Sequence, residues 1–299
     1  MRPIILGTRK SPLALKQADI VKVALQKQGH NNVEIKTYQT SGDTLSHAPL
    51  SNYGGKGLFT KEIEEALLRK EIDLAVHSMK DVETYLPENL VIPCIPVREN
   101  PCDVLVSKYN YTLESLPFGA TVGTSSLRRH ALLMHLRPDL KIVPLRGNVG
   151  TRIKKIQDGY ADATVLAYAG LSRLNQLENI VPLEIDLFIP ALAQGALGIQ
   201  CRQDDTIIYE ILMHIHDKKI GFCIEVERTF LRAIDGSCRT PVGGLAQYLN
   251  ENEISFRSFV SDPQGKQICY EKIVCAPKSI LKEVDFLGKK MRKWLEDSH

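Results

Sequence analysis

Four arginines lie within 25 residues of one another, in two glycine-containing segments at 123–129 and 145–152. A guanidinium group pairs bidentately with a carboxylate or a phosphate. Each segment follows a β-like run and opens a helix-like run, which is where α/β proteins commonly hold anions. The four residues are Arg128, Arg129, Arg146 and Arg152. They predict a site for a polyanionic small ligand; the alternative is a set of solvated arginines on helix surfaces.

Small donors accompany the first pair of arginines. Thr124, Ser125 and Ser126 stand where the helix begins, and they add hydroxyl and backbone donors to the predicted anion site. Phosphate is the first anion to consider. However, the chain has neither a G-x-x-x-x-G-K-[ST] loop nor a proper G-x-G-x-x-G fingerprint, so nucleotide binding has little support.

A second group of candidate residues follows a predicted buried strand at 72–77. Ser78, Lys80 and Asp81 fall at its carboxyl end, which faces the ligand crevice in open α/β sheets. A carboxylate beside an amine can transfer protons or hold a developing cation. Arg9, after the first predicted strand, could supply another anion contact. The alternative interpretation is an ordinary helix-start aspartate with an exposed lysine, and a surface ion pair at Arg9.

One of the seven cysteines differs from most of the others in its setting. Cys238 lies between Gly236 and Pro241 and is therefore predicted to be on a loop, beside Arg239. A loop thiol near a cation can have a lowered pKa and act as a nucleophile. Most of the others lie in apolar runs, with Cys102 as the exception. No spacing of cysteines and histidines suits a metal, so no metal site is expected.

Composition excludes several classes of protein. The formal net charge of +3 is too small for nucleic-acid binding to be the main function. No apolar run approaches the roughly 20 residues that span a bilayer, so no membrane partner is expected. The first residues do not resemble a signal peptide, and we expect a cytoplasmic protein.

The elements that must position these residues alternate between strands and helices. Ser11 and Pro12 are typical of a helix start after the strand at 3–8, and Gly29 of its end. A glycine-rich polar segment, 40–58, reads as a long loop of the kind that is often functional. The other predicted strands are 33–39, 103–107, 120–123, 140–145, 162–167, 253–260 and 267–275; the other helices are 60–70, 126–136, 150–158, 168–176, 222–234 and 278–296.

Six segments of the chain, taken in order, resemble the porphobilinogen deaminase (hydroxymethylbilane synthase) family. Any one of them could occur by chance, whereas six in sequence are specific. They are Gly7–Leu15, Gly54–Phe59, Ala75–Asp81, Val122–Arg129, Leu145–Arg152 and Gln194–Ile199.

The resemblance implies an α/β fold of three domains. Domains 1 and 2 would resemble the two lobes of a periplasmic binding protein around a central cleft, and domain 3 would be a small α+β domain that carries the cofactor cysteine. We expect residues 1–96 and 197–216 in domain 1, residues 97–196 in domain 2 and residues 217–299 in domain 3. A monomer is expected.

The resemblance also implies the reaction. A transferase of porphyrin and haem biosynthesis would condense four porphobilinogen molecules head to tail, losing ammonia each time, into hydroxymethylbilane. The chain would grow on a dipyrromethane cofactor held by a thioether to Cys238. Each pyrrole carries an acetate and a propionate, which explains a need for several arginines.

The family's site residues map onto this chain position by position. Asp81 matches the catalytic aspartate, which holds pyrrole N–H groups and stabilises the cation left by ammonia loss. The cofactor-binding positions are Cys238, Lys80, Ser78, Arg128, Arg129, Thr124, Ser126, Arg146 and Gly147. The substrate-binding positions are Arg9, Ser11, Ser125, Arg146 and Arg152.

Two other functions share parts of this pattern. A two-lobed anion-binding protein without catalysis would have the same architecture, but it would need neither Asp81 nor Cys238. An enzyme acting on phosphate esters or nucleotides could use the same basic loops, but the phosphate motifs are missing.

Overall fold

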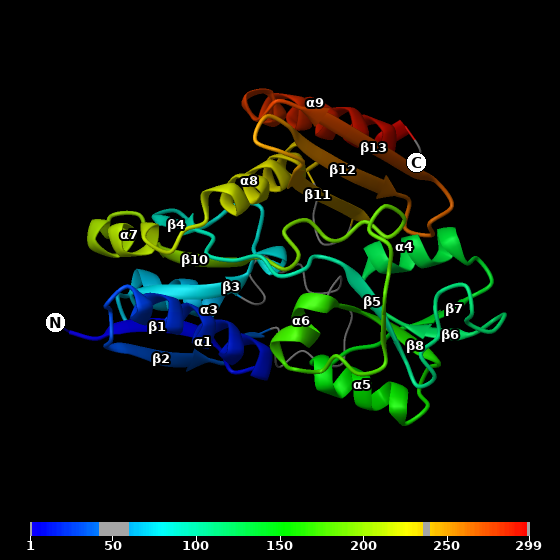
Figure 1. Ribbon diagram of the computed structural model, residues 1–299, viewed down its shortest axis with the longest axis horizontal. Helices are drawn as coiled ribbons and strands as arrows, with labels where there is room; N and C mark the ends of the chain where they lie inside the picture. Colours follow the sequence, from blue (N-terminus) through cyan, green and yellow to red (C-terminus); the bar gives the residue numbers. More distant parts are fainter. Residues whose placement is uncertain (1, 42–59, 236–239, 298–299) are drawn as a thin grey trace. The chain divides into compact units, whose positions relative to one another are not determined.

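The computed structural model describes residues 2–41, 60–235 and 240–297, which form two compact units. Unit 1 comprises residues 1–99 and 195–221, and unit 2 comprises residues 100–194 and 222–299. Each unit is described by itself below and can be followed by its colours in Figure 1. Cys238 and the predicted motif at 54–59 lie outside the described residues.

Unit 1 is built on a five-stranded sheet in the order β2-β1-β3-β10-β4. The first three strands run parallel, and β10 is antiparallel to both of its neighbours. The strands are β1 (Ile4–Arg9), β2 (Val33–Tyr38), β3 (Leu74–Ser78), β4 (Leu90–Cys94) and β10 (Leu197–Arg202), and the helices are α1 (Pro12–Lys27), α3 (Lys61–Leu68), α7 (Thr206–Met213) and the 3-10 turn η2 (Met79–Asp81).

The helices of unit 1 cover both faces of this sheet. Ala18, Val21 and Leu25 of α1 pack with Leu74 and α7 on one face. On the other face, α3 packs against Ala75, whose side chain points away from that of Leu74 because neighbours on a strand alternate. The carboxyl ends of β1 and β3 therefore lie between α1, on one face of the sheet, and α3, on the other.

Unit 2 repeats this strand pattern in a second sheet, ordered β7-β6-β8-β5-β9. Three parallel strands are again followed by two antiparallel pairings. The elements are β5 (Asp103–Ser107), β6 (Thr121–Gly123), α4 (Leu127–Leu136), β7 (Lys141–Val143), α5 (Val149–Gln157), β8 (Ala163–Ala167), α6 (Tyr168–Arg173) and β9 (Ile180–Pro182).

A third, antiparallel sheet completes unit 2 in the order β11-β12-β13. It comprises β11 (Val242–Tyr248), β12 (Ile254–Ser261) and β13 (Ile268–Cys275), with helices α8 (Lys218–Ala233) and α9 (Pro277–Asp297). Phe259 of β12 is fully buried in the core of the second sheet, together with Val122, Leu132 and Phe188. The second and third sheets thus share apolar core within unit 2.

The mixed α/β class that the sequence predicts is confirmed by these three sheets, and so is a separate small C-terminal sheet. The predicted helices and strands all exist, with ends that differ by a few residues. The sequence prediction missed β4, β9, β10, β11 and α7. None of the helices in the described part of the chain is long and apolar enough to cross a membrane. The domain limits stay a prediction.

Candidate functional site

Unit 1 contains a small cavity, of about 60 Å³, at the carboxyl ends of β1 and β3. Four of the residues predicted from the sequence line it: Arg9, Ser11, Ser78 and Asp81. Its other lining residues are Leu13, Ala14, Gln17, Thr60, Val76 and His77. The structure therefore brings together a guanidinium, a carboxylate and two hydroxyls from two separate segments of the chain. Lys80 is not among the residues that line the cavity.

Local structure fixes three of these side chains. Ser11 caps α1, and its hydroxyl accepts a hydrogen bond from the backbone N–H of Ala14 at 3.3 Å. Gln17, on the next turn, donates from Nε2 to Oγ of Ser78 at 2.8 Å. Asp81 is placed by η2, which turns the chain directly after β3.

A series of hydrogen-bonded, buried polar side chains extends from this cavity. Nε2 of His77 lies 2.9 Å from Oε1 of Gln200, and Nε2 of Gln200 donates to Oε1 of Glu64 at 3.1 Å. Burial lowers the pKa of His77 to about 4. Burial also raises the pKa of Glu64, whose hydrogen bonds to Gln200 and Thr60 oppose the shift. At neutral pH, His77 is therefore a neutral imidazole beside the Asp81 carboxylate.

In unit 2, the loop between β6 and α4 holds the three predicted hydroxyl residues. Ser126 caps α4 by accepting from the backbone N–H of Arg129 at 3.4 Å. Oγ1 of Thr124 accepts from the backbone N–H of Ser126 at 3.2 Å, and the Ser125 hydroxyl donates to the carbonyl oxygen of Leu145 at 3.2 Å. These bonds tie the start of α4 to the chain that leads into α5.

Arg128 and Arg129 are buried, each with only 6% of its surface exposed, and both pair with Asp103 at the start of β5. Arg128 donates to Oδ2 of Asp103 at 2.6 Å and to the carbonyl oxygen of Ile189 at 2.8 Å. Arg129 donates to Oδ1 of Asp103 at 2.7 Å, and Gln194 donates to the same oxygen at 3.2 Å.

Burial alone would raise the pKa of Asp103, but the charges of Arg128 and Arg129 outweigh it and lower the pKa to about 2. Two guanidinium groups and one carboxylate leave this cluster with a single positive charge. The sequence prediction treated both arginines as open donors and missed Asp103. Their binding of ligand carboxylates stays a prediction, in which a ligand would meet a guanidinium pair already held by Asp103.

The second basic segment leads into α5. Gly147 has a φ of +119°, in the region that favours glycine, and a Cβ there would collide with Thr151. Asn148 then caps α5 by accepting from the backbone N–H of Thr151 at 2.8 Å. Nε of Arg152 donates to the carbonyl oxygen of Gly147 at 2.8 Å, so the Arg152 side chain lies against the turn that precedes α5.

The described cysteines are poor nucleophiles. Burial raises the pKa of Cys94 to about 12 and the pKa values of Cys102 and Cys201 to about 11. Cys102, which looked like a loop residue in the sequence, is buried in the apolar core between β5, β8, α5 and α6. Within residues 2–41, 60–235 and 240–297, no group of His, Cys, Asp and Glu could hold a metal ion.

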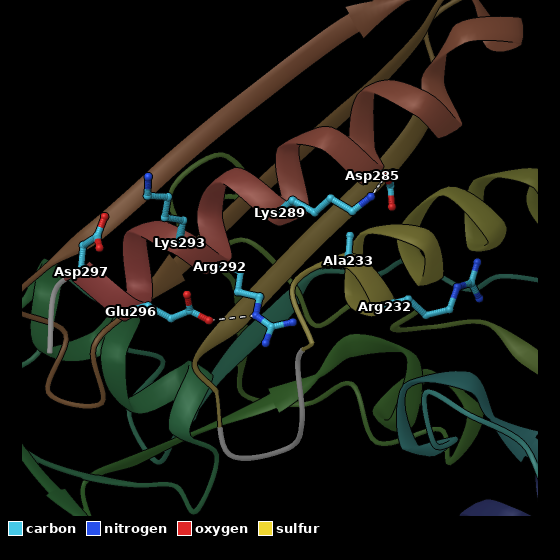
Figure 2. Close-up of a pocket in the computed structure, with 8 residues that line it drawn as sticks. All are labelled: Arg232, Ala233, Asp285, Lys289, Arg292, Lys293, Glu296 and Asp297. Atoms are coloured by element: carbon cyan, nitrogen blue, oxygen red, sulfur yellow. Dashed lines mark hydrogen bonds and ion pairs between the residues drawn. The ribbon is translucent and has the colours of Figure 1, made fainter.

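A larger open hollow, of about 520 Å³, lies between α8 and α9 in unit 2. It is lined mainly by charged residues, and Figure 2 shows Arg292 turned toward Glu296 and Lys289 toward Asp285 on α9. These are surface ion pairs between residues four apart on one helix, a pattern typical of a solvated helix face. None of the residues predicted from the sequence lines it.

Sequence reasoning missed Gln17, Thr60 and His77 around the small cavity. One of them carried a usable signal: Gln17 lies within the apolar stripe of α1, between Ala14 and Ala18, and only 4% of it is exposed. A polar residue at a core position of an amphipathic helix indicates a specific partner, because burying an amide without one is costly.

Comparison with known proteins adds family information to this geometry. The family model "Porphobilinogen deaminase, dipyromethane cofactor binding domain" matches residues 4–210, and "Porphobilinogen deaminase, C-terminal domain" matches residues 221–297. Together they cover both units.

Curated relatives carry the same name. A porphobilinogen deaminase of Oceanobacillus iheyensis is 48% identical over 276 residues, which cover 91% of this chain and 89% of the relative. That of Nitrobacter winogradskyi is 49% identical over 266 residues (88% and 84%). That of Chloroherpeton thalassium is 43% identical over 289 residues (96% and 92%).

Among solved structures, two examples align with this chain at low sequence identity. An ancestral cationic amino acid solute-binding protein aligns with a TM-score of 0.46 and 16% identity, over 71% of this chain and 87% of that one. The VFT2 domain of Bordetella pertussis BvgS aligns with a TM-score of 0.43 and 15% identity, over 72% and 85%.

Proposed function

The chain belongs to the porphobilinogen deaminase family, and from this premise we propose which of its residues carry out the reaction. The enzyme condenses four porphobilinogen molecules head to tail into hydroxymethylbilane, in tetrapyrrole biosynthesis, on a dipyrromethane cofactor. The observation that carries the assignment is the cavity in unit 1, which Asp81 lines together with Arg9, Ser11 and Ser78.

Each condensation breaks one C–N bond and forms one C–C bond. Ammonia leaves the aminomethyl group of porphobilinogen, the resulting electron-deficient carbon joins the free α-carbon of the terminal pyrrole, and that carbon then loses a proton. We assign to Asp81 the role of stabilising the positive charge that develops as ammonia leaves. Its carboxylate attracts the pyrrole N–H and the cation, and it can accept the released proton. Arg9 and the hydroxyls of Ser11 and Ser78 would orient the ligand's carboxylates.

The donors of unit 2 suit a ligand with several carboxylates. Arg146 and Arg152 flank Gly147 at the start of α5, and Thr124, Ser125 and Ser126 stand at the start of α4. Two helix N-termini with hydroxyls and guanidinium groups favour anions. A dipyrromethane has four carboxylates and therefore fits this donor set; when bound, it would supply the free pyrrole α-carbon to which the first ring is joined, and each later ring would join the ring added before it.

Arg128 and Arg129 are assigned a shared role. Because Asp103 holds both, they would present one net positive charge in a fixed geometry instead of two independent forks. Such a preorganised cation loses little side-chain entropy on binding a cofactor carboxylate. Lys80, from η2 of unit 1, is proposed as a further cofactor contact.

We assign the thioether to Cys238. The other six cysteines lie in described segments. Burial raises the pKa of five of them, and the sixth, Cys223, is buried, so none is a ready nucleophile.

Mass spectrometry of the intact protein tests this assignment. We predict a mass above that of the sequence by two linked pyrrole units, and loss of the excess in Cys238→Ser. Cys269→Ser, a substitution at a partly exposed cysteine, is the matched control and should keep the excess. A holo-grown protein of unmodified mass would contradict the tether, and loss of the excess in both variants would contradict its location.

We further propose that the protein works as a monomer in the cytosol, without nucleic acid. The family to which the chain belongs supports the cytosolic location, and the modest net charge supports the absence of a nucleic-acid partner. Sedimentation of the holoenzyme at micromolar concentration is expected to give a single species of about the 33.5 kDa chain mass.

A further inference from the structure

The buried polar chain behind the cavity of unit 1 has a defined hydrogen-bond direction. Both carboxylate oxygens of Glu64 act as acceptors: Oε1 takes a hydrogen bond from Gln200 Nε2 at 3.1 Å, and Oε2 takes one from the hydroxyl of Thr60 at 3.2 Å. Gln200 therefore turns its amide nitrogen toward Glu64 and its oxygen toward His77.

This direction fixes the state of the imidazole. The Gln200 oxygen can only accept, so His77 must carry its proton on Nε2, and Nδ1 keeps its lone pair. His77 is 6% exposed. In the pairing of β3 with β10, Gly198 lies opposite His77 and Gln200 lies opposite Ala75, so the side chains of His77 and Gln200 are on the face of the sheet that α3 covers.

Charged groups of several elements face this imidazole. Asp81 of η2 lines the same cavity and favours the charged form of His77, whereas Arg9 of β1 disfavours it. Glu64 of α3 lies one amide further away, and the charge of Glu83 acts on Glu64. Burial outweighs the opposing effects of the Gln200 hydrogen bond and the Asp81 charge, and it keeps the imidazole neutral.

We propose that His77 is a positioning residue: Gln200 and Glu64 hold it as the neutral Nε2–H tautomer, so that the Asp81 carboxylate is left to the ligand instead of pairing with an imidazolium. The inference rests on the role proposed for Asp81. A cationic His77 would attract Asp81 and neutralise the charge that the departing ammonia and the pyrrole N–H require. The neutral amide of Gln200 separates the imidazole of His77 from the carboxylate of Glu64, so these two ionisable groups do not pair directly.

The first test observes the His77 ring directly. ¹⁵N–¹H spectra of the histidine ring in the holoenzyme, assigned by the signal missing in His77→Asn, report tautomer and charge. We expect the Nε2–H tautomer, neutral from pH 8 to pH 5. A His77 ring that titrates near pH 6.5, or that carries its proton on Nδ1, would overturn the proposal even if the enzyme is fully active.

The second test moves the carboxylate next to the imidazole. In the double variant Glu64→Gln/Gln200→Glu, the number of charges and the side-chain volume are conserved, but a carboxylate now accepts from Nε2 of His77 and favours imidazolium. We expect kcat to fall by at least about tenfold at pH 7, with little change in KM, and to recover toward pH 9. A merely structural role would not make the loss depend on pH in this way.

Gln203→Glu is the matched control: it adds a carboxylate at an exposed site three residues after Gln200 and should leave kcat and its pH dependence unchanged. A folded double variant with the kcat and pH profile of the unsubstituted enzyme would refute the proposal; if it does not fold, the ring spectra decide. Normal turnover in Asp81→Glu would instead remove the proposed role of Asp81, so the two failures can be told apart.

Discussion

At the scale of single residues, charge compensation decides which groups remain available to a ligand. Asp81 lines a cavity with one guanidinium group and a neutral histidine, whereas Asp103 is saturated by Arg128, Arg129 and Gln194. Two carboxylates of the same type thus have different roles: the first faces a ligand cavity, and the second holds cations in place.

Asp81→Glu tests the first role. The added methylene moves the carboxylate by more than 1 Å at a centre where misplacement by that distance can cost about a hundredfold in rate. We expect a loss of that order in turnover, with the cofactor still attached when the intact mass is measured. Glu83→Asp, a change of the same size two residues later, should have little effect on turnover.

Asp103→Asn tests the second role. The substitution removes the charge between two buried guanidinium groups and should destabilise the protein by about 3–5 kcal/mol in urea unfolding at pH 7. Because the folded-state pKa of Asp103 is depressed to about 2, its stabilisation is present above the unfolded-state value of 3.8 and is lost as the pH falls through 2.

The difference between Asp103→Asn and the unsubstituted protein should therefore shrink between pH 4 and pH 2 and not between pH 7 and pH 5. Asp158→Asn, at an exposed pair with Lys154, is the control and should change stability little at any pH. A penalty for Asp103→Asn as small as that of the control would contradict the buried cluster.

At the scale of elements, helix caps and turns set the positions of the basic residues. Ser126 and Asn148 cap α4 and α5, and the positive φ of Gly147 turns the chain between β7 and α5. These starts could be predicted from the sequence, because hydroxyl and amide residues before an amphipathic run are local signals.

Some of the elements that escaped prediction lack clear local signals. The edge strands β4 and β9 contain Pro93 and Pro182, which argue against a strand, whereas β10 alternates apolar Leu197, Ile199 and Cys201 with Gly198, Gln200 and Arg202, a signal that the prediction did not use. The pairing of Asp103 with Arg128 and Arg129 joins residues more than 20 positions apart and depends on how β5 lies in its sheet, which local patterns do not report.

Arg146→Leu tests the start of α5. The change removes a guanidinium group while leaving the cap at Asn148 intact, so the fold should persist. We expect impaired cofactor assembly or chain growth, visible as partly elongated species in the intact mass. Lys154→Leu, on an exposed part of the same helix, is the control; unchanged product yield in Arg146→Leu would argue against an anion contact there.

At the scale of the whole molecule, the third sheet is joined to the second by more than chain connectivity. Phe259 of β12 belongs to the core of the second sheet, Arg257 pairs with Asp186, and a Cβ at Gly265 would strike the backbone of Ala131 in α4. We therefore expect unit 2 to unfold as one cooperative body.

Phe259→Ala tests this coupling. Removing a fully buried ring should destabilise unit 2 by about 3–5 kcal/mol. Hydrogen exchange should show α9 and the strands β5 and β8 losing protection together. Phe286→Ala, at a ring that is 69% exposed on α9, should change little. Loss of protection confined to β12 and β13 would show that the third sheet unfolds alone.

The position of β10 has a consequence for how the chain folds as the ribosome makes it. β10 lies between β3 and β4 in the sheet of unit 1, yet its first residue, Leu197, is synthesised long after the last residue of β4, Cys94. At about 5–20 residues per second, β4 has no strand to pair with for several seconds. The strands of the second sheet, which all fall between Asp103 and Pro182, can pair during that wait, although Phe259 joins their core only later. The nascent chain would then pair the strands of its later sheet before it completes the earlier one.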